Sequence, residues 1–450
     1  MIHKYNLNGR YILLDVNSGG VFSIDKITYH VLDHYPRHNR NETVKILKCQ
    51  YSSEALQDCI NEIDFLIESD ELFSKGIAVN NKLKNNSTIK AICLHISHDC
   101  NMRCKYCFAS QGNFQGDKLL MSEEVGKKAI DFLITNSQGR RNLEIDFFGG
   151  EPLMNMDVVE KLVEYAKKQE KECGKNFRFT LTTNGVLLDD KNMHFINENM
   201  NNVVLSLDGR KEINDAMRYT PNGKGTYEYI VKKIKKMVDL RKDKDYYVRG
   251  TFTKYNLDFS NDIFHLAELG FKNISVEPVV TKPTEDYAIT KDELPRILRE
   301  YEKLAESYCK NINNNHFNFF HFNVDLEQGP CLYKRISGCG AGSDYIAITP
   351  QGELYPCHQF VGNETFRLGT LETGITNTNC QQQFYEANLT DKEDCTQCWA
   401  KYYCGGGCLA NAYHANGDIK TPDKIGCEME KKRIECAIMV KLEQIKNSDA

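Results

Sequence analysis

Residues 100–107 read CNMRCKYC and follow residues 92–97, an apolar run that predicts a buried strand. Three thiolates spaced in this way, at Cys100, Cys104 and Cys107, can bind three irons of a four-iron, four-sulfur cluster. The fourth iron is then left without a protein ligand and can bind a small molecule through its amino and carboxylate groups. The alternatives are a zinc site or a redox dithiol at Cys104 and Cys107. Zinc usually takes paired cysteine hooks that supply four ligands, so the spacing favours an iron–sulfur cluster.

The composition is that of a globular protein with unusually many cysteines. Of 450 residues, 18 are cysteines, and 57 basic and 62 acidic residues give a formal net charge of −5. This balance provides no overall field that would attract nucleic acid or anionic lipid. The first residues are polar, and no apolar run reaches the ~18 residues needed to cross a bilayer, so we expect a cytoplasmic protein without a membrane segment. Because cytosolic thiols are kept reduced, the cysteines indicate metal sites rather than disulfides.

Strands and helices alternate between residues 92 and 325. The predicted strands are 92–97, 143–148, 177–182, 203–207, 247–253 and 274–277. Helical periodicity between them predicts helices near 125–133, 158–168, 227–240 and 259–269. Repeated units of this kind predict a parallel sheet, and about six of them predict a partial barrel of the α/β class. Ligands bind at the carboxyl ends of such strands.

Short motifs follow four of these strands. They are GGEP at 149–152, TTNG at 182–185, SLDG at 206–209 and VEP at 276–278. Glycines let backbone groups approach a ligand closely, and Glu151 can complement an ammonium group. Taken alone, GGEP is equally consistent with an ordinary turn, and the other motifs could simply end their strands.

The cysteine spacing, the aromatic Tyr106 before the last cysteine and GGEP one unit later together resemble the signature of the radical SAM superfamily. Members of that superfamily cleave S-adenosylmethionine (SAM) reductively. The resemblance implies a four-iron, four-sulfur cluster on Cys100, Cys104 and Cys107. It also implies SAM contacts from strand-end residues and from an arginine beyond the fourth strand: Gly149, Gly150, Glu151, Asn184, Ser206, Asp208 and Arg218. Glu277, at the end of the sixth strand, is a further candidate for the same pocket.

A second group of cysteines lies in the last third of the chain, where periodic runs are few. They read Cys339-x12-Gly352-x4-Cys357, then Cys395-x2-Cys398-x5-Cys404-x3-Cys408, then Cys427. This order is similar to the SPASM domain of peptide-modifying radical SAM enzymes, which carries two auxiliary clusters. The resemblance implies one cluster bound by Cys395, Cys398, Cys404 and Cys427. It implies another bound by Cys339, Cys357 and Cys408, with Cys331 as the candidate fourth ligand. Three four-iron, four-sulfur clusters are thus expected, and a zinc ribbon is the alternative for Cys395 and Cys398 alone.

Residues 1–76 form a separate segment. Strands are predicted at 11–15 and 20–24, helices at 27–35, 42–51 and 54–67, and an Asn- and Lys-rich linker at 80–90. Two or three strands before three helices, at the start of a SPASM enzyme, resemble the winged-helix domain of ribosomal-peptide maturases, which captures a leader peptide as an added strand. The alternative is a structural cap on the barrel. The expected domains are 1–80 for leader recognition, 81–325 for the barrel and 326–450 for SPASM.

With its parts in this order, the chain closely resembles the maturases of SCIFF peptides (six cysteines in forty-five residues). The resemblance implies a thioether between a Cys sulfur and a Thr carbon of a Cys-rich precursor with a leader, and a reductant such as ferredoxin or flavodoxin. No side chain is singled out as a catalytic acid or base, because the cofactor carries the chemistry. One alternative is an anaerobic sulfatase-type maturase that oxidises Cys or Ser to formylglycine. The other is a protein that uses its clusters only for electron transfer, which would leave GGEP without a purpose.

Overall fold

The computed structural model describes residues 1–76, 88–310, 317–326 and 332–448. Its largest sheet has eleven strands in the order β12-β11-β10-β8-β7-β6-β4-β13-β14-β15-β16. The barrel strands are β4 (Ala91–Ser97), β6 (Asn142–Gly149), β7 (Asn176–Thr183), β8 (Asn202–Ser206), β10 (Tyr246–Phe252) and β11 (Asn273–Pro278). Neighbours among them are all parallel. The predicted partial barrel of the α/β class is confirmed, and each predicted strand bound lies within one residue of the observed one.

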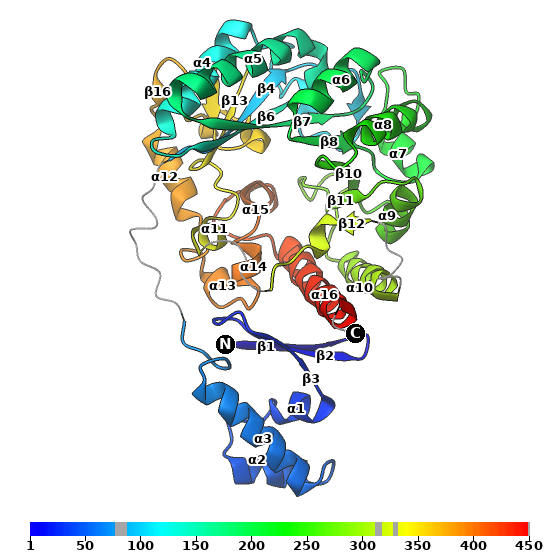
Figure 1. Cartoon of the computed structure of the whole chain (residues 1–450), viewed down its shortest axis with the longest axis vertical. Coiled ribbons are helices and arrows are strands. Elements are labelled where there is room, and N and C mark those ends of the chain that lie inside the picture. Colours follow the sequence, from blue (N-terminus) through cyan, green and yellow to red (C-terminus); the bar gives the residue numbers. More distant parts are fainter. Residues whose placement is uncertain (77–87, 311–316, 327–331, 449–450) are drawn as a thin grey trace.

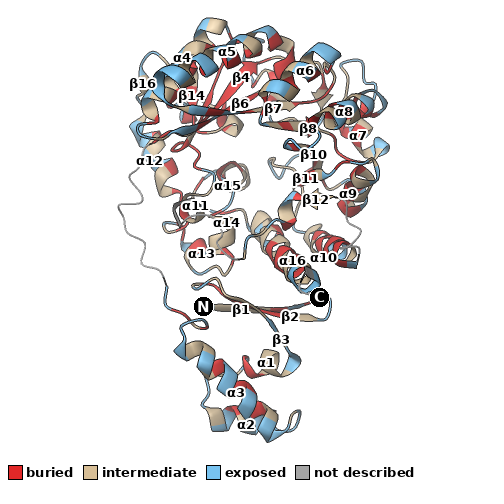
Figure 2. Ribbon diagram, viewed as in Figure 1, coloured by how far each residue is buried: buried red, intermediate tan, exposed pale blue. Residues whose placement is uncertain are grey.

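Side-chain alternation explains why the barrel has a covered outer face and a polar inner face. In β6, Leu143, Ile145 and Phe147 are buried, whereas Glu144 and Asp146 between them are exposed or half-buried. Residues two apart share one face of a strand, so the apolar set faces the helices. These helices are α4 (Glu123–Asn136), α5 (Met156–Cys173), α6 (Asp190–Asn199), α7 (Lys211–Met217), α8 (Tyr227–Arg241) and α9 (Phe259–Glu268). Figure 1 shows α4, α5 and α6 on the outer side of the sheet, and Figure 2 shows the buried residues between the layers.

The C-terminal region continues the same sheet. Strand β13 (Tyr345–Ile348) pairs in parallel with β4, on the side opposite to β6. The strands β14 (Glu353–Tyr355), β15 (Gly369–Thr370) and β16 (Gly374–Ile375) follow in antiparallel order. Short helices complete the region: α11 (Leu332–Ser337), α12 (Thr378–Glu386), α13 (Glu393–Thr396), α14 (Lys401–Cys404) and α15 (Leu409–Asn416). This region is therefore joined to the barrel by main-chain hydrogen bonds, which the sequence pattern did not indicate.

Two long helices pack together beside the barrel (Figure 1). They are α10 (Leu294–Lys310), which was not predicted, and α16 (Lys424–Ser448). After α10 the chain forms β12 (Asn318–Phe319), which pairs with β11, and then the short helix η4 (Phe320–Phe322).

The N-terminal segment is a three-stranded antiparallel sheet followed by three helices. Its elements are β1 (Ile2–Leu7), β2 (Arg10–Asp15), β3 (Val21–Ile24), α1 (Lys26–Val31), α2 (Arg40–Leu47) and α3 (Ser53–Glu68). Leu13 packs with the segment's own helices, whereas Ile12 and Leu14 belong to the main core. The sheet therefore lies between its helices and the rest of the protein, as Figure 1 shows. The predicted linker at 80–90 falls mostly outside the described residues.

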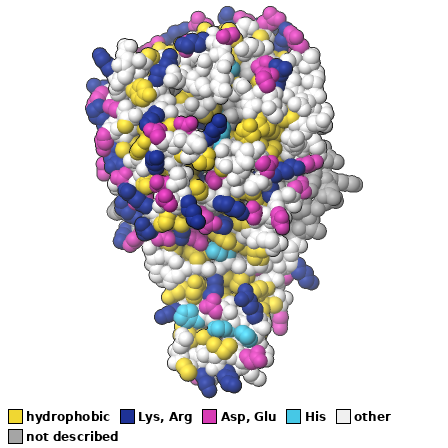
Figure 3. Space-filling model, turned by 180° about the vertical axis from the view of Figure 1, so that it is seen from behind, with side chains coloured by type: hydrophobic (Ala, Val, Ile, Leu, Met, Phe, Trp, Pro, Cys, Tyr) yellow, Lys and Arg dark blue, Asp and Glu magenta, His cyan; other side chains and the backbone are white. Residues whose placement is uncertain are grey.

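The surface carries charges of both signs, as the near-balance of basic and acidic residues in the sequence leads us to expect. Figure 3 shows basic and acidic side chains intermixed over one face of the molecule. No helix in the described parts of the chain is both long and apolar enough to span a membrane.

Candidate active site

The three cysteines after β4 come close together at the carboxyl end of the barrel. Strand β5 (Arg103–Cys104) pairs with β9 (Arg218–Tyr219), so that Cys104 lies opposite Arg218. Burial and, to a smaller extent, the charges of Glu151, Cys104 and Cys107 raise the pKa of the Cys100 thiol to about 12. Burial also raises the pKa of Cys104 to about 11, with a smaller contribution from Cys107. These electrostatic contributions place the thiols of Cys100, Cys104 and Cys107 near one another.

The glycines of GGEP let the end of β6 approach the end of β4 and the cysteine loop. Gly149 has φ +128°, and a Cβ there would lie 2.3 Å from the Ser97 carbonyl oxygen. A Cβ at Gly150 would lie 2.2 Å from the Asp99 carbonyl oxygen. The Gly150 N–H donates to Ser97 O over 2.7 Å, and the Glu151 N–H donates to Asp99 O over 2.9 Å. No side chain fits at either glycine, because each Cβ would overlap the backbone of the neighbouring segment.

Glu151 joins the ends of β6 and β7. Its side chain is buried and accepts from the Thr183 hydroxyl at 2.8 Å, the Asn184 N–H at 2.8 Å and the Leu153 N–H at 3.1 Å. Burial raises the pKa of Glu151 to about 7, although these donors lower it. Oε1 accepts two of these hydrogen bonds and Oε2 accepts one, so Oε2 keeps a lone pair for a further donor.

Asn184 joins β7 to the cysteine loop. Its amide nitrogen donates to the Asn101 side-chain oxygen over 2.8 Å and lies 3.7 Å from the Cys100 sulfur. Its amide oxygen accepts from the Val186 N–H at 2.9 Å. The expected SAM-contact residues Glu151 and Asn184 are thus brought to the cysteine loop by hydrogen bonds within the chain.

A buried network connects Asp208, Tyr106 and Arg218. The Tyr106 hydroxyl donates to the Asp208 carboxylate at 2.7 and 2.8 Å, and an Arg218 Nη donates to the Tyr106 oxygen at 3.1 Å. Burial raises the pKa of Asp208, and the charge of Arg218 partly offsets this rise. The Arg218 side chain is 6% exposed, and its Nε is buried without a hydrogen-bond partner. A free, buried guanidinium donor fits an anionic group such as a carboxylate. The sequence identified Tyr106 as part of the signature but not the role of its hydroxyl.

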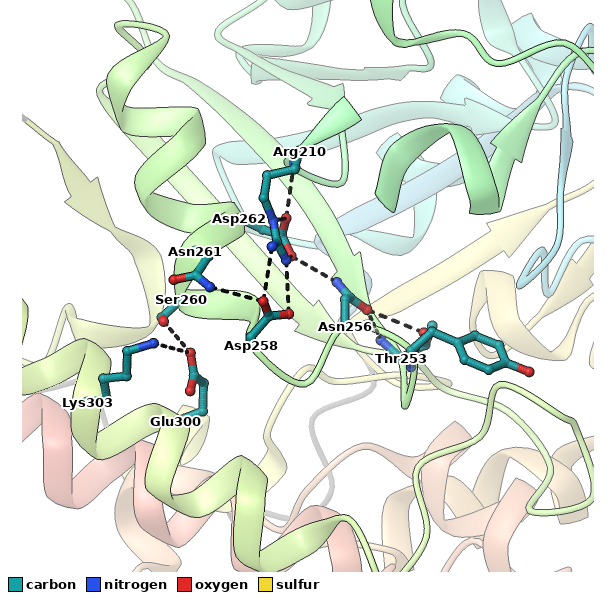
Figure 4. A network of polar contacts seen from close by, with 10 residues as sticks. Arg210, Thr253, Asn256, Asp258, Ser260, Asn261, Asp262, Glu300 and Lys303 are labelled. Atoms are coloured by element: carbon teal, nitrogen blue, oxygen red, sulfur yellow. Dashed lines mark hydrogen bonds and ion pairs between the residues drawn. The ribbon is translucent and has the colours of Figure 1, made fainter. Parts of the chain in front are cut away.

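A network of polar contacts joins the loop after β8 to the start of α9 (Figure 4). A Cβ at Gly209 would lie 2.3 Å from Asp262 Cβ, so the loop lies directly against the start of α9. The Arg210 Nε donates to Asp262 at 2.7 Å, and its two Nη atoms donate to Asp258 at 2.9 and 3.0 Å. These contacts hold the loop that carries Asp208 against α9.

Ser206 and Glu277 lie elsewhere on the inner face of the barrel. Ser206 is half-buried at the end of β8, in register with Arg249 of β10. Glu277 lies 3.0 Å from His321 Nε2 and 3.7 Å from an Arg433 Nη of α16. Burial would raise the pKa of Glu277, but the charges of His321, Arg249 and Arg433 hold it well below its usual range. Glu277 therefore contacts Ser275 of its own strand, His321 of η4 and Arg433 of α16.

The C-terminal cysteines gather in two groups. In one group, burial raises the pKa of the Cys357 thiol far above its usual value, and Cys339 and Cys408 contribute as near neighbours. In the other group, burial raises the pKa of the Cys427 thiol to about 11, and the charges of Cys395 and Cys398 contribute. Burial raises the pKa of the Cys404 thiol to about 11 as well, with contributions from Cys427 and Cys395. Cys331 lies outside the described residues. Among the described side chains, no three His, Cys, Asp or Glu residues are arranged to hold a single metal ion.

Lys392 lies between the two groups and was not predicted from the sequence. Its ammonium donates to Gly406 O at 2.8 Å, and its side chain is buried. Burial lowers the pKa of Lys392, and the thiols of Cys395 and Cys408, from different groups, act against this. A buried cation of this kind stabilises the negative charge of thiolate ligands.

Histidines and aromatic rings separate the first cysteine loop from Cys357. His95 Nδ1 lies 3.0 Å from His98 Nε2, and the Tyr345 hydroxyl lies 3.2 Å from His358 Nδ1. The His358 ring lies 5.0 Å from the ring of Phe148 and 5.4 Å from that of Phe108, measured between centroids. Burial lowers the pKa of both His98 and His358 to about 4, so these imidazoles are neutral at pH 7.

Comparison with known proteins agrees with this arrangement. Residues 94–258 match the radical SAM superfamily, and residues 339–399 match SPASM, an iron–sulfur cluster-binding domain. The radical SAM cyclopropyl synthase TigE of Paramaledivibacter caminithermalis is 23% identical over 87% of this chain and 88% of its own. A cysteine-type anaerobic sulfatase-maturating enzyme of Clostridium novyi is 26% identical over 74% of this chain and 90% of its own. The crystal structure of Streptococcus suis SuiB bound to the precursor peptide SuiA is similar in fold, with a TM-score of 0.55, 16% identity and coverage of 94% of this chain and 98% of SuiB.

The chain thus has a radical SAM domain followed by a SPASM domain. It is a radical SAM enzyme, and these two domains imply iron–sulfur clusters and SAM binding.

Proposed function

We propose that this enzyme joins a Cys sulfur to a Thr carbon within a ribosomally made, Cys-rich precursor peptide. The observation that carries the proposal is the N-terminal sheet, which offers a free edge to a peptide beside the SPASM region. The TigE and SuiB comparisons extend over nearly the whole chain and support a peptide substrate, because SuiB was crystallised with a precursor peptide.

Contacts between the N-terminal sheet and the SPASM region leave β3 as the accessible edge. The His3 ring of β1 stacks on Trp399, next to Cys398, with ring centroids 3.7 Å apart. The Tyr5 hydroxyl donates to Glu435 O of α16 at 3.0 Å. Strand β3 pairs with β2, and the described residues give it no second strand partner. A leader peptide added to β3 would complete its hydrogen bonds, which is a common mode of peptide recognition.

The residues at the carboxyl end of the barrel would hold SAM on the first cluster. Arg218 supplies the free buried donor for the SAM carboxylate, while Glu151 and Asp208 supply the acceptors for its ammonium group. Cys100, Cys104 and Cys107 would ligate three irons of that cluster, and the SPASM cysteines would bind two more clusters. Bound there and reduced by one electron from a donor such as ferredoxin or flavodoxin, SAM supplies the 5′-deoxyadenosyl radical that removes a hydrogen atom from the acceptor residue.

The seven SPASM cysteines are one too few for two complete clusters, so the group of Cys339, Cys357 and Cys408 leaves a position for the substrate thiol. A metal-bound thiol is deprotonated and held in place, as carbon–sulfur bond formation requires. Cys331 is the competing fourth ligand. If the position is open, a Cys331→Ala enzyme keeps its iron content and its activity. Loss of one cluster's iron together with activity would assign Cys331 as the ligand.

The test is mass spectrometry of a Cys-rich precursor after anaerobic incubation with enzyme, SAM and dithionite. Thioether formation removes two hydrogens: the Thr carbon loses a hydrogen atom to the deoxyadenosyl radical, and the thiol would lose its proton to solvent and an electron to the auxiliary cluster as the carbon–sulfur bond forms. One thiol also becomes unreactive to iodoacetamide for each bond formed. Formylglycine formation, which the Clostridium novyi relative makes the main alternative, changes the Cys side chain itself and leaves no link to Thr.

A further inference from the structure

A polar cavity of about 610 Å³ lies at the amino-terminal ends of the barrel strands, opposite to the cysteine loop. Its walls come from the first residues of β6, β7 and β8 and from the start of β10, and they include Glu144, Arg178, Thr180, Asn202, Asp245 and Tyr247. The volume lies within the range of roughly 300–1,000 Å³ that is typical of ligand sites. The functions described above do not involve this cavity.

The chemistry of the walls fits peptide groups better than an apolar or anionic ligand. Asn176 donates to the Asn142 side-chain oxygen over 3.1 Å, and such amides carry both a donor and an acceptor, as a peptide group does. Glu144 lies opposite Arg178 in register, and Arg178 also lies 3.8 Å from Asp245. Carboxylates outnumber guanidinium groups here, so the cavity favours hydrogen-bond donors over anions.

Asn202 gives a specific reason to expect a donor. Its side-chain oxygen is buried and has no hydrogen-bond partner. A buried acceptor without a partner costs free energy, and an N–H group from an occupant would remove that cost. Thr180 of β7 lies opposite Asn202 in register and lines the same cavity.

The cavity is continuous with the inner face that leads to the SAM end of the barrel. On β8, Asn202, Val204 and Ser206 are half-buried and alternate with fully buried residues. On β10, Arg249 is exposed on the same face as Tyr247. From Asn202 to Ser206 the strand rises about 13 Å at roughly 3.3 Å per residue, a distance that an extended peptide spans with about four residues.

We propose that this cavity binds the precursor peptide itself, about four residues from the residue that is modified. A peptide N–H would donate to the free oxygen of Asn202, and neighbouring amide and hydroxyl groups would bind the rest of the segment. The inference rests on the proposed function in that it takes a peptide as substrate. It adds a second place, besides the N-terminal sheet, where the peptide is held.

Photocrosslinking tests the position directly. The probes are synthetic ten-residue peptides with one Cys and one Thr, in which a diazirine-bearing leucine lies four residues before or four residues after the Thr. Each is mixed with the holoenzyme and SAM without reductant, irradiated, and mapped by peptide mass spectrometry. We expect one of the two probes to label residues 176–180, 202–204 or 245–247. Labels only on the SPASM region or on the outer helices, or no label at all, would overturn the proposal.

An Asn202→Leu enzyme adds a matched comparison, because it removes the acceptor while keeping a side chain of similar size. It should label at least tenfold less at the cavity, whereas Asn379→Leu, on the exposed side of α12, should label as the wild type does. If Asn202→Leu binds less iron or has a changed circular dichroism spectrum, the variant is not folded as the wild type is. The position of the label on the wild-type enzyme then decides whether the peptide binds in the cavity. A wild-type enzyme that labels at the cavity but forms no thioether supports the cavity and refutes the proposed reaction. Thioether formation without labelling at the cavity supports the proposed reaction and refutes the cavity as a peptide-binding site.

Discussion

Replacement of Arg218 by Gln should weaken SAM binding by about one to two orders of magnitude. The Arg218 guanidinium is buried, its Nε has no partner, and its charge acts on Asp208 and Cys104. A charge-assisted hydrogen bond in such a place contributes about 1.5–3 kcal/mol. At about 1.4 kcal/mol per tenfold change in affinity, the loss corresponds to one to two orders of magnitude in Kd.

Arg241→Gln is the matched control. Arg241 is also a buried arginine of the barrel, but it donates to the carbonyl oxygens of Met200, Asn201 and Asp245, at the opposite end of the strands. Its replacement should lower the melting temperature without changing the SAM affinity of the folded enzyme. The assay is anaerobic isothermal titration calorimetry of holoenzyme with SAM and without reductant. Equal SAM affinity in the wild type and in Arg218→Gln would show that Arg218 has only a structural role.

Three further predictions follow from the cysteine groups, the N-terminal sheet and the half-buried carboxyl of Asp146. Replacing Cys100, Cys104 and Cys107 together by Ala should abolish 5′-deoxyadenosine formation while most auxiliary iron remains; product in this variant would refute the cluster assignment. A chain of residues 82–450 should still cleave SAM without peptide but bind leader peptide poorly, and equal turnover of full-length precursor would refute leader recognition by the N-terminal sheet. Burial, and secondarily Glu144, raises the pKa of Asp146 to about 7, so the wild type loses stability as the pH rises from about 4 towards 7. The melting temperature of Asp146→Asn should therefore exceed that of the wild type at pH 8, and the difference should be larger at pH 8 than at pH 5. A difference in melting temperature that does not depend on pH would contradict the shifted pKa.

The close approach of the first three cysteines could be predicted because their spacing is local. Three thiols within eight residues must lie near one another, and the strand before them places them at a ligand-binding edge. The barrel strands were predictable for the same reason, because apolar residues such as Leu143 and Ile145 alternate with polar ones. Helix α10 was missed although Ile297, Tyr301 and Leu304 recur at helical spacing, because it follows the last predicted strand and the helices were sought only between strands.

Features that depend on long-range pairing could not be predicted. The contact of Tyr106 with Asp208 and Arg218 requires β5 and β9, two strands of only two residues each. Lys392 lies between two cysteine groups only after the chain has folded, and no motif marks it. The cavity at the strand starts is built from single polar residues on separate strands, each of which reads as an ordinary inner-face position.

The measurement that tests the account most directly is mass spectrometry of a Cys-rich precursor, together with counting of 5′-deoxyadenosine, in one anaerobic reaction. The account predicts a product two hydrogens lighter, one alkylatable thiol fewer, fragment ions that place the link between a Cys and a Thr, and one 5′-deoxyadenosine per link. A peptide that keeps its mass while 5′-deoxyadenosine accumulates, or a Cys converted to formylglycine with no link to Thr, would contradict it.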